Sequence, residues 1–151
     1  MIDIRGFRDW VDEDLLQFGF RRRGMVWRLM NSEVQWGVQL HKNIYSQYYM
    51  LDVGLDLQTE TLRKPRDCPI SGLLDLLPMV KDTWVVGASR SETNMDDEER
   101  KCRLSEALQI FGRFAVSLQT TEHVAHALQA GEFRSFFIHK DVWGILGVPS
   151  S

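Results

Sequence analysis

Three stretches in the first half of the chain alternate apolar and polar residues with a period of two. They cover residues 25–30, 34–41 and 49–58. Successive side chains of a β-strand point to opposite faces of its sheet, so each stretch is typical of a strand with one buried and one solvated face. The short polar connection at Asn31, Ser32 and Glu33 predicts a hairpin between the first two strands, and the third strand is expected to pair with the second.

Additional strands are marked less sharply further along the chain. Residues 65–71 are compatible with an edge strand, residues 73–80 with a strand or a short helix, and residues 83–88, which include Trp84, with a further short strand. The connections between these segments are too short for helical crossovers. We therefore expect an antiparallel sheet of four to five strands.

Helical spacing precedes and follows these strands. Apolar residues three and four positions apart predict a helix over residues 7–18, ended by Gly19, and a long helix that runs to Leu118. The acidic residues 96–99 fall at the N-terminus of the long helix, where the helix dipole favours negative charge. A short helix is expected over residues 122–129 and a last helix within residues 133–146.

These patterns predict an α+β fold with one helix before the sheet and C-terminal helices packed against it, in a single domain over residues 1–151. A composition of 44% hydrophobic and 26% charged residues supports one substantial core. Cys68 and Cys102 are too few and too far apart for a disulfide scaffold, so we expect free thiols in a reducing compartment. Since no signal peptide and no apolar run approaching ~18 residues is found, we expect a cytoplasmic protein without a membrane partner.

The sequence carries no pattern that identifies an enzyme, a metal site or a cofactor site. It lacks glycine-rich phosphate loops and the serine elbow of the hydrolases. His123 and His126 are three residues apart beside Glu122, an arrangement that departs from the His-Glu-x-x-His zinc motif. Cys102 lies among basic residues, but no set of cysteine, histidine and acid can be assembled around it. We therefore predict no catalytic residues, no metal and no cofactor.

Several short motifs, taken in order, resemble one known family. They are a helix, Gly19-Phe20-Arg21-Arg22-Arg23-Gly24, a hairpin that bears tryptophan, Cys68, Leu73-Leu74-Asp75-Leu76-Leu77-Pro78, and Trp84. This order resembles the uncharacterised bacterial proteins grouped as domain-of-unknown-function family 4304, over residues 5–140. The chain departs from the family in having Ser71-Gly72-Leu73 where the family has a step with arginine. The resemblance implies a bacterial α+β domain without an established activity, some relatives of which look like immunity or accessory proteins beside toxin genes.

Two hypotheses place a binding site on the sheet. The first is a protein-binding module of immunity or regulatory type that uses the outer sheet face and the loop from Lys42 to Tyr48, because tyrosines such as Tyr45 and Tyr48 are favoured at protein contacts. The second is a small-molecule-binding protein or enzyme with a polar site on the sheet face. Its candidate residues share the polar faces of neighbouring strands: Arg28, His41, Asp52 and Asp56.

A third hypothesis is nucleic-acid binding through a local basic patch. Its residues are Arg21, Arg22, Arg23 and Lys42, with further basic residues at Arg28, Arg63, Lys64 and Arg66. A net charge of −3 and a pI near 5.8 lack the basic excess that is typical of nucleic-acid-binding proteins. Trp27, Trp36 and Tyr49 are expected to pack the core rather than to stack on bases. The expected partner is therefore another protein.

Overall fold

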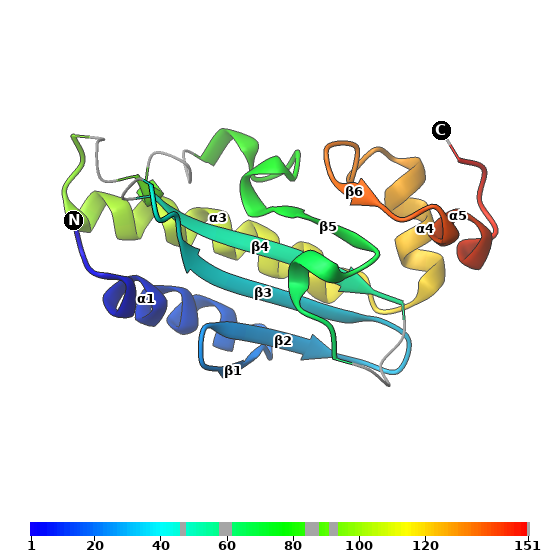
Figure 1. Ribbon diagram of the computed structural model, residues 1–151, viewed down its shortest axis with the longest axis horizontal. Coiled ribbons are helices and arrows are strands. Elements are labelled where there is room, and N and C mark those ends of the chain that lie inside the picture. The colour runs from blue at the N-terminus through cyan, green and yellow to red at the C-terminus, as the bar shows by residue number, and fades with distance from the viewer. Residues whose placement is uncertain (46–47, 58–61, 84–87, 91–93, 151) are drawn as a thin grey trace.

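The computed structural model describes residues 1–45, 48–57, 62–83, 88–90 and 94–150 (Figure 1). Its helices are α1 (Ile4–Leu16), α3 (Asp97–Ser117), α4 (Thr121–Gln129) and α5 (Asp141–Leu146). Its strands are β1 (Arg21–Arg23), β2 (Val26–Met30), β3 (Gln35–Lys42), β4 (Tyr49–Asp56), β5 (Ile70–Leu73) and β6 (Phe137–Ile138). Short 3₁₀ helices, η1 (Pro65–Asp67), η2 (Leu74–Leu76) and η3 (Lys81–Thr83), lie in the connections after β4 and β5. The predicted α+β class is confirmed.

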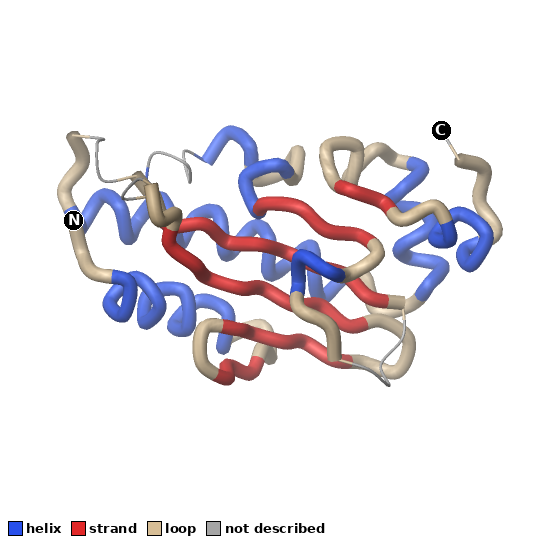
Figure 2. The backbone as a smooth tube through the Cα atoms, viewed as in Figure 1, coloured by secondary structure: helices blue, strands red, loops and turns tan. Residues whose placement is uncertain are grey.

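The six described strands form one antiparallel sheet in chain order (Figure 2). Both predicted hairpins are confirmed, since Trp27 lies opposite Val38 and Val38 lies opposite Val53. The sheet has more strands than expected because β1 and β6 carry no alternating pattern. The first consists of three arginines and the second of two residues, which is too short to show a period.

Three other expectations need correction. The stretch 65–71 begins as η1 and becomes a strand only at Ile70, and this strand is not at the edge because β6 pairs with its far side. The ambiguous stretch 73–80 contains η2. Residues 133–146 hold β6 before α5, rather than one helix. The strand predicted over residues 83–88 is wrong at its two ends, because Thr83 is the last residue of η3 and Ala88 is helical. Residues 84–87 lie outside the described residues, so that part stays a prediction.

The N-termini of α3 and α4 match the local signals, whereas α1 begins and ends two to three residues before the predicted range of 7–18. Asp96 caps α3, because its Oδ1 accepts a hydrogen bond from the Glu99 backbone N–H at 2.8 Å. Thr120 caps α4 in the same way. Gly19, after α1, has a φ of 94°, a conformation that glycine adopts without strain. Among the described residues, no helix has the length and apolar content that a membrane span requires.

Helices α1 and α3 cover one face of the sheet and enclose the core. Figure 1 shows α3 running behind the central strands, on the side opposite η1. Trp36 lies at the centre, fully buried, with its ring edge-on to Phe111 of α3 at 5.5 Å between ring centroids. Trp27 and Tyr49 are also buried, as the alternation predicts. The side chains of β2, β3 and β4 that face α3 therefore form the apolar half of the core.

The other face of the sheet is partly covered by residues 63–68, which contain η1 and are called the η1 segment below. Gly37 of β3 lies directly opposite Gly54 of β4, so two neighbouring positions carry no side chain on this face. Pro65 packs there: a Cβ built on Gly37 would lie 3.1 Å from Pro65 Cγ, and a Cβ built on Gly54 would collide with the Pro65 carbonyl oxygen and lie 2.8 Å from Cys68 Sγ. This glycine pair lets the η1 segment touch the backbone of the sheet.

We expect Gly54→Ala to lower the free energy of unfolding by about 2–3 kcal/mol, because the added methyl group must push Pro65 off the sheet. Gly37→Ala should cost less, since its new contact is with a side-chain carbon that can shift. Gly144→Ala is the matched control, because nothing lies within 4 Å of that position. Urea denaturation measures all three. If Gly54→Ala unfolds at the midpoint of Gly144→Ala, the packing of Pro65 on the sheet is wrong.

Candidate functional site

Two of the four predicted sheet-face residues meet at one end of the sheet. His41 of β3 and Asp52 of β4 lie on the outer face, with 2.7 Å between His41 Nε2 and Asp52 Oδ2. The contact falls outside hydrogen-bond geometry, so it is an ion pair only when the imidazole is protonated. Both side chains are partly exposed. They form a small polar pair rather than an enclosed site.

Asp56 lies at the other end of β4 and is deeply buried, with only 2% of its side chain exposed. Its Oδ2 lies 3.4 Å from Nε of Arg63 but has no hydrogen-bond partner among the described residues. Gln35, opposite Asp56 in the register, is also buried, and neither of its amide atoms has a partner in the described part of the chain. Unpaired buried polar groups cost about 1–3 kcal/mol each. This end of the sheet therefore carries polar groups that the fold itself leaves unsatisfied.

The four predicted residues do not converge on one site. Asp52 and Asp56 are four residues apart on β4, which at ~3.3 Å per residue separates them by about 13 Å. The η1 segment lies between them on the glycine pair. Arg28 is engaged with this segment, because its guanidinium donates to the carbonyl of Arg63 at 3.0 Å. The predicted polar site is divided into a His41–Asp52 pair and an Asp56–Arg63 pair.

A cavity of about 370 Å³ adjoins the Asp56–Arg63 pair. Its charged or polar lining is Asp56, Arg63, His139 and Asp141, and its apolar lining is Leu57, Pro69, Val142 and Ile145. His139 is fixed in place because its backbone N–H donates to Pro69 at 2.7 Å and its Nδ1 accepts from the Asp141 backbone at 3.1 Å. No local signal in the sequence connects residues 56, 63 and 139, since the η1 segment and β6 bring them together. The volume suits a small ligand.

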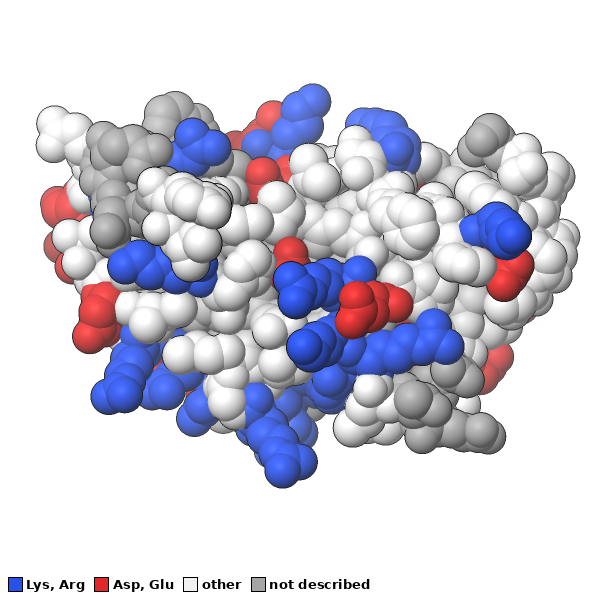
Figure 3. Space-filling model, viewed as in Figure 1, with Lys and Arg blue, Asp and Glu red and all other residues white. Residues whose placement is uncertain are grey.

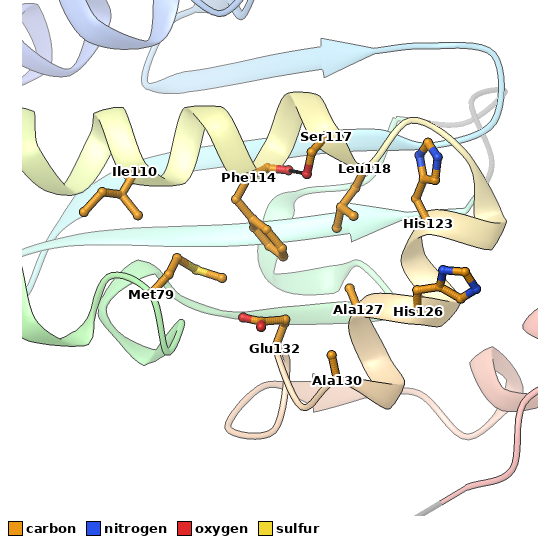
Figure 4. Close-up of a pocket in the computed structure, with 10 residues that line it drawn as sticks. All are labelled: Met79, Ile110, Phe114, Ser117, Leu118, His123, His126, Ala127, Ala130 and Glu132. Atoms are coloured by element: carbon orange, nitrogen blue, oxygen red, sulfur yellow. Dashed lines mark hydrogen bonds between the residues drawn. The ribbon is translucent and has the colours of Figure 1, made fainter.

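A second, shallower groove of about 570 Å³ lies between α3, α4 and the η2–η3 segment (Figure 4). Its floor is apolar and includes Ile110, Phe114 and Leu118 of α3. His123 and His126 lie at its margin on α4. His123 already has a structural contact, because its Nδ1 accepts from the Gln119 backbone N–H at 3.2 Å. Within the described parts of the chain, no group of three His, Cys, Asp or Glu side chains forms a metal-binding cluster.

The tip of the β3–β4 hairpin carries the other predicted contact residues. Tyr45 is 92% exposed and its neighbour Ile44 is 85% exposed. Lys42 precedes them with an exposed side chain. Tyr48, by contrast, is half-buried, pairs with Arg90 in a β-bridge, and holds the Arg90 guanidinium 4.9 Å from its ring centroid. Burial raises the pKa of the Tyr48 phenol. The two predicted tyrosines thus have different environments.

The predicted basic patch is also divided by the register. Arg21 lies opposite Arg28 and Arg23 opposite Val26, so both side chains are on the outer face. Arg22 lies opposite Trp27 on the core side, where it is 3.7 Å from Asp12 of α1. Basic side chains gather over the lower half of the face that carries η1 (Figure 3). Lys42, the last residue of β3, shares the alternation face of Leu40 rather than the face that carries Arg28.

The comparisons with known proteins found no family model, no curated protein and no solved structure that matches this chain.

Cys68 and Cys102 are both free, but only Cys102 is exposed. Burial, together with the nearby Asp56 carboxylate, raises the pKa of the Cys68 thiol to about 12, while Arg28 and Arg63 oppose this shift. A thiol with a raised pKa holds almost no thiolate at about pH 8, so only Cys102 should react with iodoacetamide in the folded protein. The reactivity of Cys68 should rise as the pH approaches 12 or as urea unfolds the chain.

Mass spectrometry of the alkylated protein counts the modified thiols. The Cys102→Ser variant is the control and should remain unmodified at about pH 8 until it is unfolded. Rapid alkylation of Cys68 in the folded variant would show that this thiol is not buried between the η1 segment and the sheet.

Proposed function

We propose that this chain is a protein-binding module of immunity or accessory type, which acts in the cytoplasm and contacts its partner through the tip of the β3–β4 hairpin. The observation that carries the proposal is the exposure of Ile44 and Tyr45, at 85% and 92%. Burial of apolar surface contributes about 25 cal/mol per Å². A partner that covers both side chains would recover this free energy, and tyrosine is among the residues that dominate protein interfaces.

Two hydrogen bonds of Asn43 hold the described residues at the start of the hairpin tip. Asn43 Oδ1 accepts a hydrogen bond from the backbone N–H of Tyr45 at 2.9 Å, and the backbone N–H of Asn43 donates to Tyr48 at 2.8 Å. An asparagine that bonds two residues ahead stabilises a turn. Because this hydrogen bond already holds the backbone from Asn43 to Tyr45, less conformational entropy is lost there when a partner binds.

In this proposal, Lys42, Tyr45 and Tyr48 make different contributions to the contact with the partner. Tyr45, with Ile44, supplies the apolar contact, and exposed Lys42 supplies a positive charge beside it. Tyr48 supports the base of the tip through its contact with Arg90. The two free thiols suit a reducing compartment, which agrees with a cytoplasmic location.

The test begins with a tagged protein used to isolate a stoichiometric partner from its native cells. The partner is then purified and its affinity for the tip variant Ile44→Ala/Tyr45→Ala is measured by calorimetry. We expect affinity to fall at least about tenfold, because both exposed anchors are lost. Folding should be unchanged, since neither side chain contributes to the core.

Leu16→Ala is the matched control, because Leu16 is an exposed apolar residue on α1. Its affinity for the partner should equal that of the parent protein. Equal affinity of the tip variant and the control would remove the hairpin tip from the interface. Failure to isolate any partner under these conditions would count against the protein-binding function itself.

A second candidate function is binding of a small zwitterion in the cavity beside Asp56. The buried Asp56 carboxylate and the Arg63 guanidinium present one negative and one positive group side by side, and apolar residues line the rest of the cavity. An amino acid with an aliphatic side chain carries the complementary ammonium, carboxylate and apolar groups. This candidate retains the sheet-face ligand hypothesis but restricts it to one end of the sheet.

L-leucine, isovalerate and isoamylamine separate the contributions, because the last two each keep only one charged group of leucine. We expect L-leucine alone to raise the melting temperature, since a ligand that binds only the folded state stabilises it. Asp56→Asn should abolish this shift, whereas Asp67→Asn, at an exposed position on η1, should leave it intact. Equal shifts with all three compounds, or none, would exclude a zwitterion site.

A further inference from the structure

The outer face of the sheet presents a group of basic side chains that the hairpin tip does not use. Arg21 and Arg23 of β1 and Arg28 of β2 share this face through the strand register. The η1 segment adds further basic residues directly beside Arg28, whose guanidinium reaches the Arg63 carbonyl. We call the following six residues the arginine platform: Arg21, Arg23, Arg28, Arg63, Lys64 and Arg66. Figure 3 shows basic side chains gathered over the lower half of this face, with acidic side chains among those near its centre.

The positive charge of the platform is poorly compensated within the chain. Arg63 pairs with Asp56, but Arg21, Arg23, Lys64 and Arg66 form no ion pair among the described residues. Arg21 and Arg28 lie directly opposite each other, and like charges in that position destabilise a sheet. The chain as a whole has a net charge of −3, so the platform does not follow from a general excess of basic residues. Its repulsion would be relieved by an anionic partner.

The η1 half of the platform is held rigidly on the sheet. Pro65 packs against the glycine pair, and two backbone carbonyls of the segment accept hydrogen bonds from strand side chains. The Arg28 guanidinium of β2 donates to Arg63, and Ser71 Oγ of β5 donates to Arg66. Within the segment, Cys68 Sγ donates to the Lys64 carbonyl. The side chains of Lys64 and Arg66 stay exposed while their backbone is fixed. A preorganised backbone lowers the entropic cost of binding.

The composition of the platform favours carboxylates of a protein over a nucleic acid. It contains five arginines and one lysine, and arginine is enriched at protein interfaces whereas lysine is depleted. Trp27 and Trp36, the tryptophans of the underlying strands, are fully buried and offer no surface for base stacking.

We infer that the arginine platform binds an acidic surface of the protein partner. This inference rests on the proposed protein-binding function and adds the charge of the partner to it. The guanidinium groups would pair with carboxylates in bidentate, charge-assisted hydrogen bonds, which are stronger than hydrogen bonds between neutral groups. The apolar hairpin tip and the platform then make separate contributions to one interface.

The experiment uses two fluorescent probes, an acidic peptide of about twelve Glu and Asp residues and a DNA duplex of about twelve base pairs, at about 50 mM salt. The platform variant is Lys64→Gln/Arg66→Gln, which removes two exposed charges without breaking an ion pair among the described residues. The control, Arg113→Gln/Lys140→Gln, removes one arginine and one lysine from exposed positions elsewhere. Fluorescence anisotropy measures each affinity, and urea denaturation checks that both variants are folded.

We expect the peptide to bind and its affinity to fall about tenfold in the platform variant but not in the control. Tighter binding of the duplex, lost in the same variant, would assign the platform to nucleic acid and overturn the inference. Equal losses of peptide affinity in the platform variant and the control would show that only net charge matters, which would overturn the inference. The absence of peptide binding to the parent protein would overturn it as well.

The partner isolated with the tagged protein separates this inference from the proposed function. If Ile44→Ala/Tyr45→Ala weakens that complex and Lys64→Gln/Arg66→Gln does not, protein binding stands and the platform inference fails. If both variants weaken the complex, the proposed function and the platform inference both stand. If neither weakens it, the interface lies elsewhere and both placements fail.

Discussion

The packing of Pro65 on the Gly37–Gly54 pair is the interaction on which the outer face of this sheet depends. A side chain at Gly54 would hold the η1 segment away from the strands, and one at Gly37 would crowd the Pro65 ring. With both side chains absent, the segment reaches the backbone, buries the thiol of its own Cys68 against Gly54 and brings Arg63 over Asp56. The same contact fixes the carbonyls that Arg28 and Ser71 bond. One pair of glycines thus determines which polar residues are buried and which charges are presented.

The alternation in the sequence predicts which residues share a face, but it cannot show what covers that face. The apolar face is buried against the helices as expected, with Trp36, Val38 and Val53 fully enclosed. The polar face is expected to be solvent-exposed, yet Gln35 and Asp56 are almost completely buried at the end of the β3–β4 pair opposite the hairpin tip. Their burial depends on segments from later in the chain, including the η1 segment. The pairing of His41 with Asp52 follows from alternation and register, whereas the meeting of Asp56, Arg63 and His139 requires tertiary structure.

The short strands β1 and β6 could not be predicted from the sequence, because neither shows a hydrophobic period. Arg21–Arg23 has no apolar residue, so no hydrophobic period marks it as β1. It pairs with β2 because Gly24, with a φ of 63°, permits a tight turn between buried Phe20 and buried Trp27. Strand β6 consists of Phe137–Ile138, and it exists through its pairing with β5. The longer helices, by contrast, carry both period and caps, which is why α1, α3 and α4 agree with the sequence patterns.

The helix side and the outer sheet face of the fold differ in charge. On the helix side the acids have structural partners: Asp14 of α1 accepts hydrogen bonds from Ser105 and Gln109 of α3, and Glu13 pairs with Lys101. The acidic first turn of α3 also offsets the helix dipole. The arginine platform on the opposite side has few such partners. A net charge of −3 therefore averages over two unlike surfaces, and electrostatic steering of a partner depends on the surface that it approaches. The sign of the whole chain does not decide what the sheet face can bind.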